Sequence, residues 1–520
     1  MGERTGDTDG GGDDGFAAVR TLFKGGGVVL AGLVLELGIS FAGKLLIARE
    51  LGRVDYGAVS LGIITASIGS TLIILGLDQG IGRHLPRDDD PSARRSVLVS
   101  AFRVAVPLSL LLGAAVVLLA PLLATSVFDD PSLTLVLRVF AVAIPFGVVM
   151  KLALGSIQGM QETAPKVAIQ NVTFPVTRLL GIVSALLLGA GSMGVSYAYL
   201  ASYVAAALAG IYYLYSRTSF FDFDIPYRGR ERELLSFSLP LMVTSAMTIV
   251  LSDIDMYMLG AFRGTGEVGV YNVVYPLAQL LTVALGAFGF LFMPVFSELD
   301  ADDRRSQMKR LYQVVTKWVL IATLPLFLVL VAIPQSVIRY TFGAEYLPGA
   351  AALSVLSVGF FLHTAVGLNK SALTSLGHTS LLMVDDVATA AFNVALNLVL
   401  IPQFGLLGAA YATTASYALL NLLYSVQLYT RTAIHPFTRA LVLPPMVGGA
   451  AMGLLYVLVR TSVGTSPWSL AALFVSFLVV YGIAIVRFGI EPEEVRLVLS
   501  MEERFGVDLG PLKQLANRLM

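Results

Sequence analysis

Residues 51–57 read Leu-Gly-Arg-Val-Asp-Tyr-Gly, and residues 263–269, which lie 212 positions later, read Arg-Gly-Thr-Gly-Glu-Val-Gly. The acidic residue and the last glycine coincide in the two stretches. A second match follows at nearly the same offset, where Gly-Val-Ser-Tyr-Ala at 194–198 falls on Gly-Ala-Ala-Tyr-Ala at 408–412, and Ser202-Tyr203 falls on Ser416-Tyr417. Similarity at a nearly constant offset indicates an internal repeat. The sequence therefore predicts two related halves.

The composition around these stretches is that of a membrane protein. Of the 520 residues, 56% are hydrophobic and 13% are charged, and the mean hydropathy is +0.78. Soluble domains carry about 25% charged residues, so lipid must cover much of this surface. A window of about 20 apolar residues predicts membrane spans near 26–48, 57–79, 97–121, 133–156, 167–190, 194–215, 235–260, 268–293, 312–334, 349–374, 381–401, 406–429, 438–459 and 467–488.

Each half contains six predicted spans, an even number, so the two copies have the same topology. The predicted fold is an all-α integral membrane protein of about fourteen transmembrane helices, with two parallel six-helix lobes and two further helices. The predicted parts are a disordered acidic tail (1–25), an N-lobe (26–215), a linker (216–234), a C-lobe (235–430), the last two spans (438–488) and an amphipathic tail (489–520). Lys and Arg are concentrated in the loops on one side, which predicts that both termini are cytoplasmic in the cell membrane.

Several classes of function are disfavoured. A formal net charge of zero gives no indication of a nucleic-acid partner. The sequence has no cysteine and four scattered histidines, so we expect no metal site and no resident cofactor. Because no nucleophile–base pair and no phosphate-binding loop is evident, an enzyme is also disfavoured.

Three blocks carry a resemblance to a known family. The first is Leu-Ile-Ala-Arg-Glu-Leu-Gly at 46–52, running into Asp-Tyr-Gly at 55–57, and the second is Gly-Leu-Asp-Gln-Gly-Ile-Gly-Arg at 76–83. The third is Asn-Val-Ala-Leu-Asn-Leu-Val-Leu-Ile-Pro at 393–402, continuing through 405–413. Together with the number of spans, these blocks resemble the polysaccharide-exporter (Wzx-like O-antigen and oligosaccharide flippase) branch of the MOP, or MATE-like, flippase superfamily, from about residue 20 to 490.

The resemblance implies a two-lobed bundle with an alternating-access cavity. It implies as cargo an oligosaccharide linked to an isoprenoid phosphate or pyrophosphate, which would move from the cytoplasmic to the outer leaflet for surface polysaccharide or glycoprotein assembly. Membrane lipids, and glycosyltransferases of the same pathway, would then be its partners. Lipid II flippases also have fourteen spans, so the number of spans does not exclude that cargo.

Charged residues within a predicted span are candidates for function because burying them in lipid is costly. We predict that Lys44, Arg138, Lys151 and Arg178 bind the phosphate, since cations in a low-dielectric cavity attract an anionic headgroup. The acids Glu36, Asp253, Asp255, Asp385 and Asp386 could gate transport, or could couple it to an ion gradient by binding H⁺ or Na⁺. The offset of 212 aligns Asp255 with Gly43, the residue before Lys44, so the two helices could meet across the cavity at a similar depth. Asn393 and Asn397 could contact sugar hydroxyls, and Arg83 and Lys370 lie at the cytoplasmic rim.

Each of these residues also has a purely structural explanation. The charged pairs could hold the bundle together, Lys370 could reach the interface along its apolar stem, and the asparagines could bond between helices. Two other functions stay open. A cation-coupled exporter of drugs or metabolites would need a dominant buried acid, and a non-transporting scaffold for glycosyltransferases would need neither the repeat nor the charges at mid-membrane.

Overall fold

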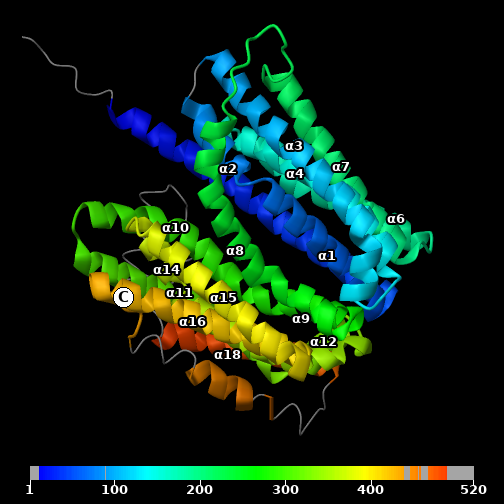
Figure 1. Cartoon of the computed structure of the whole chain (residues 1–520). Coiled ribbons are helices and arrows are strands. Elements are labelled where there is room, and N and C mark those ends of the chain that lie inside the picture. Colours follow the sequence, from blue (N-terminus) through cyan, green and yellow to red (C-terminus); the bar gives the residue numbers. More distant parts are fainter. Residues whose placement is uncertain (1–10, 88–89, 439–445, 455, 458–465, 489–520) are drawn as a thin grey trace, which may run out of the picture. The chain divides into compact units, whose positions relative to one another are not determined.

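The computed structural model describes residues 11–87, 90–438, 446–454, 456–457 and 466–488, and the regular structure of this part of the chain is helical (Figure 1). The chain forms two compact units, Met1–Val273 and Val274–Met520. We refer to them as unit 1 and unit 2 and describe each by itself.

Unit 1 consists of helices joined by short connections. They are α1 (Gly11–Ile73), α2 (Leu77–His84), α3 (Pro91–Leu122), α4 (Leu133–Gly159), α5 (Thr163–Val167), α6 (Phe174–Leu187), α7 (Gly191–Arg217) and α8 (Glu231–Arg263). A π-helical segment, Ala168–Thr173, joins α5 to α6, and another, Leu123–Val127, extends α3. Helix α9 (Thr265–Gln279) begins in unit 1 and ends in unit 2.

Unit 2 repeats this pattern of long helices. It contains α10 (Val283–Ala301), α11 (Arg305–Ala332), α12 (Pro334–Thr341), α13 (Ala350–Val366), α14 (Leu368–Ser375), α15 (Thr379–Phe404), α16 (Leu406–Thr432) and α18 (Pro467–Phe488). Helices α15 and α16 pack along each other, and α16 also packs against α13. A multi-span membrane protein with an all-helical fold is thus confirmed.

The helix bounds follow the spans predicted from hydropathy. Ten helices of the described residues are long and apolar enough to cross a membrane, with Ala31–Ile73 counted as one. Helix α1 has 63 residues, which at ~1.5 Å per residue is far longer than a bilayer core of about 30 Å. It is broken at Gly52, where φ is 75° and ψ is 171°. The predicted span 26–48 lies in its first arm, and the predicted span 57–79 begins in its second arm and ends in α2.

One predicted segment has a different structure, and two others lie partly or wholly outside the described residues. Residues 11–25, predicted to be disordered, belong to α1. The predicted span 438–459 is only partly described, and the predicted amphipathic tail 489–520 is not among the described residues.

The internal repeat is visible in the backbone. Gly264, 212 residues after Gly52, has φ 83° and ψ 175°, which is nearly the same conformation. A left-handed φ of this kind is accessible to glycine without steric cost, so the same residue makes the same corner in both copies. The side-chain amide of Asn272 also donates a 2.6 Å hydrogen bond to the hydroxyl of Ser60, its counterpart at an offset of 212. The corresponding corners of the two copies therefore pack directly against each other within unit 1.

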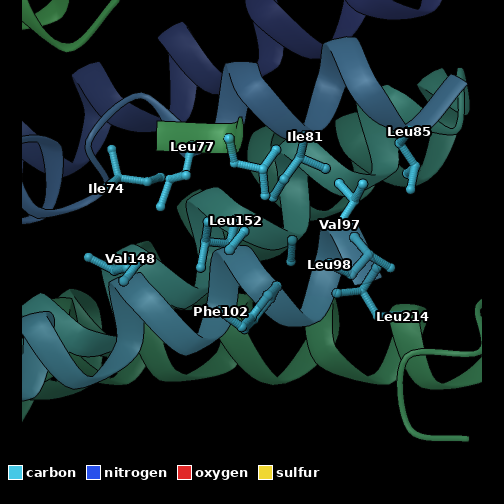
Figure 2. Close-up of a cluster of buried hydrophobic side chains, with 14 residues drawn as sticks. Ile74, Leu77, Ile81, Leu85, Val97, Leu98, Phe102, Val148, Leu152 and Leu214 are labelled. Atoms are coloured by element: carbon cyan, nitrogen blue, oxygen red, sulfur yellow. The ribbon is translucent and has the colours of Figure 1, made fainter. Parts of the chain in front are cut away.

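Helix α4 is central to unit 1. It packs against α1, α2, α3 and α7, and a cluster of buried apolar side chains surrounds it, with Phe102 of α3, Leu152 of α4 and Leu214 of α7 among its members (Figure 2). The outer faces carry large apolar side chains instead. Leu118 is 78% exposed and Leu187 is 83% exposed. Such leucines would be costly to hydrate, so these faces are suited to contact lipid acyl chains.

Candidate functional site

Unit 1 contains a cavity of about 540 Å³ between α1, α2, α4, α5 and the start of α6. Polar side chains supply much of its wall, and they include two cations, two acids and three amides. They are Glu36, Thr71, Asp78, Gln79, Lys151, Gln158, Lys166 and Gln170. A cavity with convergent polar groups between apolar helices is the kind of site that binds a polar ligand. We call it the unit 1 cavity.

The close approach of α2 and α4 positions one side of this cavity. A Cβ atom on Gly155 would lie 2.6 Å from the carbonyl oxygen and 2.8 Å from the Cα atom of Asp78, so only glycine allows this contact. Lys151 lies one helical turn before Gly155, on the same side of α4. The contact therefore brings the carboxylate of Asp78 and the ammonium group of Lys151 to one cavity.

Another part of the cavity wall is formed where α5 is followed by the π-helical segment and then by α6. Lys166 precedes the π-helical segment, Gln170 lies within it, and Phe174 is the first residue of α6. All three line the cavity. Segments of π-helix are frequent at functional sites because the extra residue per turn redirects side chains. Gln170 of this segment lines the same space as Lys151, and so does Lys166, which lies two residues before the segment.

The two lysines are held by neutral partners. Lys151 Nζ donates a 2.6 Å hydrogen bond to Thr71 Oγ1, and Lys166 Nζ donates a 2.8 Å bond to Gln158 Oε1. Among the described side chains, neither ammonium group has an acidic partner within 4 Å. Asp78 interacts electrostatically with both of them at longer range. The lysines are therefore free to compensate an anionic group of a ligand.

The acid Glu36 lines the same cavity, and its carboxylate accepts a short hydrogen bond from the side-chain amide of Asn171. This bond joins the first arm of α1 to the π-helical segment. The Glu36 carboxylate is therefore held in place by a neutral amide and not by a positively charged side chain.

Arg178 and Lys44 lie beside the cavity. Arg178 Nη2 donates a 2.6 Å hydrogen bond to Ser40 Oγ, and its guanidinium group lies 5.2 Å from the centroid of the Phe174 ring, which lines the cavity. It also lies 5.4 Å from the ring of Tyr199. Lys44 interacts electrostatically with Arg178 and with Asp253. The structure thus brings four predicted residues of unit 1 together: Glu36 and Lys151 in the wall, and Arg178 and Lys44 next to it.

Other predicted residues of unit 1 lie elsewhere. Arg138 is exposed near the start of α4, where Nε donates a long bond of 3.4 Å to the carbonyl of Val117, so it does not contribute to the unit 1 cavity. Asp255, which the repeat offset aligns with Gly43, is buried and accepts a 2.5 Å bond from Tyr271. The acid that interacts with Lys44 is Asp253.

Arg83, predicted at the cytoplasmic rim, is exposed on α2. Its guanidinium group stacks over Phe237 at 4.1 Å from the ring centroid.

In unit 2 the predicted asparagines and aspartates are buried against neighbouring helices, whereas Lys370 is exposed. Asn397 Nδ2 donates to Asn393 Oδ1 at 3.0 Å, and Asn393 Nδ2 donates to Ser416 Oγ of α16 at 3.2 Å. These asparagines therefore make bonds within α15 and between α15 and α16. Asp385 and Asp386 are also buried in α15, and Lys370 lies 3.5 Å from Asp386.

Of the polar residues that line the unit 1 cavity, the sequence predicted only Glu36 and Lys151, and two charged residues, Asp78 and Lys166, were missed. Asp78 lies in the block 76–83 that carries the family resemblance, so a signal for it existed. Lys166 follows Pro165 at the start of a predicted span, where a lysine ordinarily reaches the membrane interface. Nothing in the sequence distinguished it from such a lysine, because its position depends on the π-helical segment.

The fold defines the class of this protein. A solved structure titled "Lipid II flippase MurJ, inward closed conformation" superimposes with a TM-score of 0.70 over 90% of this chain and 98% of that chain, at 16% identity. The fold is therefore that of the MOP superfamily, to which MATE transporters also belong, and the predicted fold class is confirmed.

The particular family follows from the sequence comparison. The family model described as "Polysaccharide biosynthesis protein" matches residues 22–300, and the chain belongs to this family. A relative in Haloferax volcanii, "Probable low-salt glycan biosynthesis flippase Agl15", is 22% identical over 75% of this chain and 80% of its own length. "Uncharacterized membrane protein MJ1068" of Methanocaldococcus jannaschii is 28% identical over 36% of this chain, and the chain spans only 37% of that protein.

Proposed function

We propose that this protein is a flippase that moves an oligosaccharide, linked to an isoprenoid phosphate or pyrophosphate, from the cytoplasmic to the outer leaflet of the cell membrane. Transport would proceed by alternating access, both termini would be cytoplasmic, and the glycan would serve surface polysaccharide or glycoprotein assembly. Family membership and the relative named as a glycan biosynthesis flippase support this proposal. Glycosyltransferases of the same pathway would supply the cargo.

The observation that carries the proposal is the pair of lysines in the unit 1 cavity. Lys151 and Lys166 have neutral hydrogen-bond partners, and their positive charges are only partly compensated by Asp78 at longer range. A phosphate group or a sugar carboxylate would give both ammonium groups an anionic partner, joined by charge-assisted hydrogen bonds. Gln79 and Gln170 add amides that suit sugar hydroxyls.

The residues that line the unit 1 cavity are also less suited to bind a lipophilic cation, the typical cargo of a drug exporter. The two ammonium groups of the wall repel a cationic drug, and its three amides suit sugar hydroxyls. The cavity therefore favours an anionic, hydroxyl-rich ligand over the cargo of a drug exporter.

The test measures the sidedness of lipid-linked oligosaccharides in cells without this gene. A membrane-impermeant glycosidase trims outward-facing glycans, and mass spectrometry identifies the lipids. We expect an untrimmed glycolipid to accumulate and wild-type protein to restore trimming. Lys151→Met and Lys166→Met should each lower the rate of restoration by roughly 10- to 100-fold, because a hydrogen bond to a charged group contributes about 1.5–3 kcal/mol.

The matched control is Lys309→Met, which removes a lysine at the start of α11, in unit 2, outside the cavity. At equal protein level it should restore trimming as wild type does. Equal restoration by all three variants would remove the cavity lysines from the transport site. Unchanged glycolipids in the deletion strain would reject the flippase itself and lead to assays of drug and ion flux.

A further inference from the structure

The segment 218–230 connects α7 to α8 in unit 1 and consists of turns and irregular chain (Figure 1). We call this segment the strap. The hydroxyl of Ser96 accepts a 2.9 Å hydrogen bond from the backbone N–H of Arg228. The hydroxyl of Ser100 accepts a 3.0 Å bond from the backbone N–H of Arg230. Because the two serines lie one turn apart on one face of α3, the end of the strap lies along that helix.

Two further contacts fix the start and the middle of the strap. Arg95 of α3 is buried, and its Nη1 atom donates a 2.7 Å bond to the carbonyl oxygen of Ile225. The ring of Phe220 lies 4.9 Å from the ring of Phe102 and packs against the buried apolar cluster around α4. The strap is therefore held along its length, and the fold determines where its remaining side chains lie.

Next to the anchored Phe220, the strap presents aromatic side chains outward. Phe223 is 84% exposed, and Phe221 is exposed as well. The ring of Phe221 lies 5.8 Å from that of Tyr215, which is 67% exposed near the end of α7. Leaving a large apolar side chain in water instead of burying it costs roughly 1.5–3 kcal/mol. A group of such side chains on a surface indicates that a partner or a membrane covers it.

This aromatic group continues the outer face of α7. Leu208, Tyr212 and Tyr215 follow one another at spacings of four and three residues, so they lie on one face of the helix. All three are exposed. Because Gly191–Arg217 is long and apolar enough to cross a membrane, this face is suited to contact lipid. The aromatic side chains of the strap therefore adjoin a lipid-facing surface.

The lengths of α7 and α3 indicate the depth of the strap in the bilayer. Helix α7 has 27 residues, which at ~1.5 Å per residue is about 40 Å, whereas a bilayer core is about 30 Å thick. The ends of α7 therefore extend into the headgroup layers. On α3, residues 104–128 contain no charged residue, so its apolar part begins just after Arg103, about one turn beyond Ser100. Both helices place the strap at the level of the headgroups.

The charged residues of the strap and of its start suit this level. Arg217, at the end of α7, and Arg228 are exposed, and a guanidinium group binds phosphate oxygens with charge-assisted hydrogen bonds. Asp222 and Asp224 flank Phe223, and carboxylates are costly in hydrocarbon. They limit the insertion of Phe223 to the interface, where aromatic side chains are enriched in membrane proteins.

We propose that the strap is an interfacial membrane anchor, in which Phe221 and Phe223 insert among phospholipid headgroups. Arg217 and Arg228 bind the phosphates of the same lipids. Arg230, whose backbone is bonded to α3, is the residue directly before α8, so the anchor also fixes the start of α8 relative to the bilayer surface. The proposal involves no residue of the unit 1 cavity and does not depend on the cargo proposed above.

The experiment measures the depth of position 223 in a bilayer. The chain has no cysteine, so Phe223→Cys gives the full chain one attachment point for a nitroxide spin label. Because Phe223 is exposed, this change leaves the core intact. The labelled protein is placed in phosphatidylcholine nanodiscs, and power-saturation EPR compares collisions with oxygen, which concentrates in lipid, and with a water-soluble nickel chelate. We expect frequent collisions with oxygen and a partial loss of access for the chelate.

Two control labels mark the limits of the depth scale. Leu118→Cys lies on an exposed face of α3 within its uncharged stretch, so oxygen should reach it and the chelate should not. Arg304→Cys lies among charged residues between α10 and α11, so the chelate should reach it freely. A label at position 223 should lie between these limits. If the chelate reached position 223 as freely as position 304, the strap would face water and the proposal would be overturned.

Further variants, each carrying the label at position 223, test what holds the anchor. Ser96→Ala combined with Ser100→Ala removes the bonds to the end of the strap, so access of the chelate should increase. Arg217→Gln combined with Arg228→Gln should also increase it, whereas lysine at both positions should keep most of the protection because the charge remains. Unchanged access in the glutamine variant would reject the arginine–phosphate contacts, and unchanged access in the alanine variant would reject the role of α3 in positioning the anchor.

Discussion

Replacing Gly57 with alanine should destabilise the corner where the two copies of the repeat meet. A Cβ atom on Gly57 would lie 1.8 Å from the carbonyl oxygen of Thr265 and 2.9 Å from the backbone nitrogen of Gly269. The reciprocal contact is equally close, because a Cβ atom on Gly269 would lie 1.9 Å from the carbonyl oxygen of Arg53. Backbone atoms cannot rotate away as side chains do, so the start of α9 would have to move.

The expected magnitude follows from two opposing terms. Overpacking a tight contact typically costs about 1–3 kcal/mol, and more where the backbone must shift. Alanine in place of glycine within a helix recovers roughly 0.5–1 kcal/mol. Because the closest clash involves backbone on both sides, we expect the cost to exceed the gain by at least about 1 kcal/mol. The apparent unfolding temperature should fall by several degrees.

The assay is thermal unfolding of the full chain in detergent, followed by the fraction that remains monodisperse on size exclusion. A fixed heating rate is needed because unfolding of such proteins is commonly irreversible. Gly38→Ala is the matched control on the same helix, since no atom lies within 4 Å of its added Cβ. It should leave the unfolding temperature unchanged or raise it.

Gly269→Ala should resemble Gly57→Ala, and the double variant should lose less than the sum of the two, because both changes strain the same contact. If Gly57→Ala and Gly38→Ala gave the same unfolding temperature, the close packing of this corner would be wrong.

Three further predictions concern the cavity and one helix end. Gly155→Ala should push α4 away from the backbone of Asp78 and lower glycolipid trimming at equal protein level, whereas normal trimming would contradict the role of this contact in positioning the cavity. Arg178→Ala should reduce trimming and Arg178→Lys should restore part of it; equal trimming by wild type and both variants would remove this arginine from the site. The Asp90 carboxylate accepts hydrogen bonds from the amide and hydroxyl of Ser92, which lower its pKa below the ordinary value. The Asp90 cap of α3 is therefore fully formed above the Asp90 pKa of the unfolded chain, and it is lost as the pH falls through the Asp90 pKa of the folded chain. Amide exchange at the start of α3, corrected for the intrinsic rate, should therefore speed up on acidification in the wild type. The Asp90→Ala variant should not show this change.

The sequence predicted the helices well because lipid leaves the backbone little choice. Every peptide group in the membrane must bond within its own helix, so an apolar run of about 20 residues becomes a helix of that length. The predicted spans 133–156, 194–215 and 406–429 accordingly lie within α4, α7 and α16. The repeat offset of 212 aligned residues 51–57 with 263–269, and in the structure the backbone conformation of Gly52 recurs at Gly264.

The candidate site depended on features that no single stretch of sequence contains. Glu36 and Lys151 were recognisable because charges inside spans are rare. Lys166 joins them in the tertiary structure, where it lines the same cavity and its ammonium group bonds to Gln158 of α4. Likewise, Asp253 and Asp255 were both candidates, and the structure shows that Asp253 interacts electrostatically with Lys44, whereas Asp255 bonds to Tyr271, because two residues along a helix differ in direction by about 200°.

Hydropathy, the repeat and the family blocks thus determined the membrane class, the all-helical fold and the approximate positions of the spans, since these depend on composition and local hydrogen bonding alone. The tertiary structure decided which charges share a cavity and which are satisfied within the bundle. Those outcomes depend on how each helix is rotated and how closely glycines such as Gly155 let two backbones approach. Neither property can be read from a charge and its position in the chain.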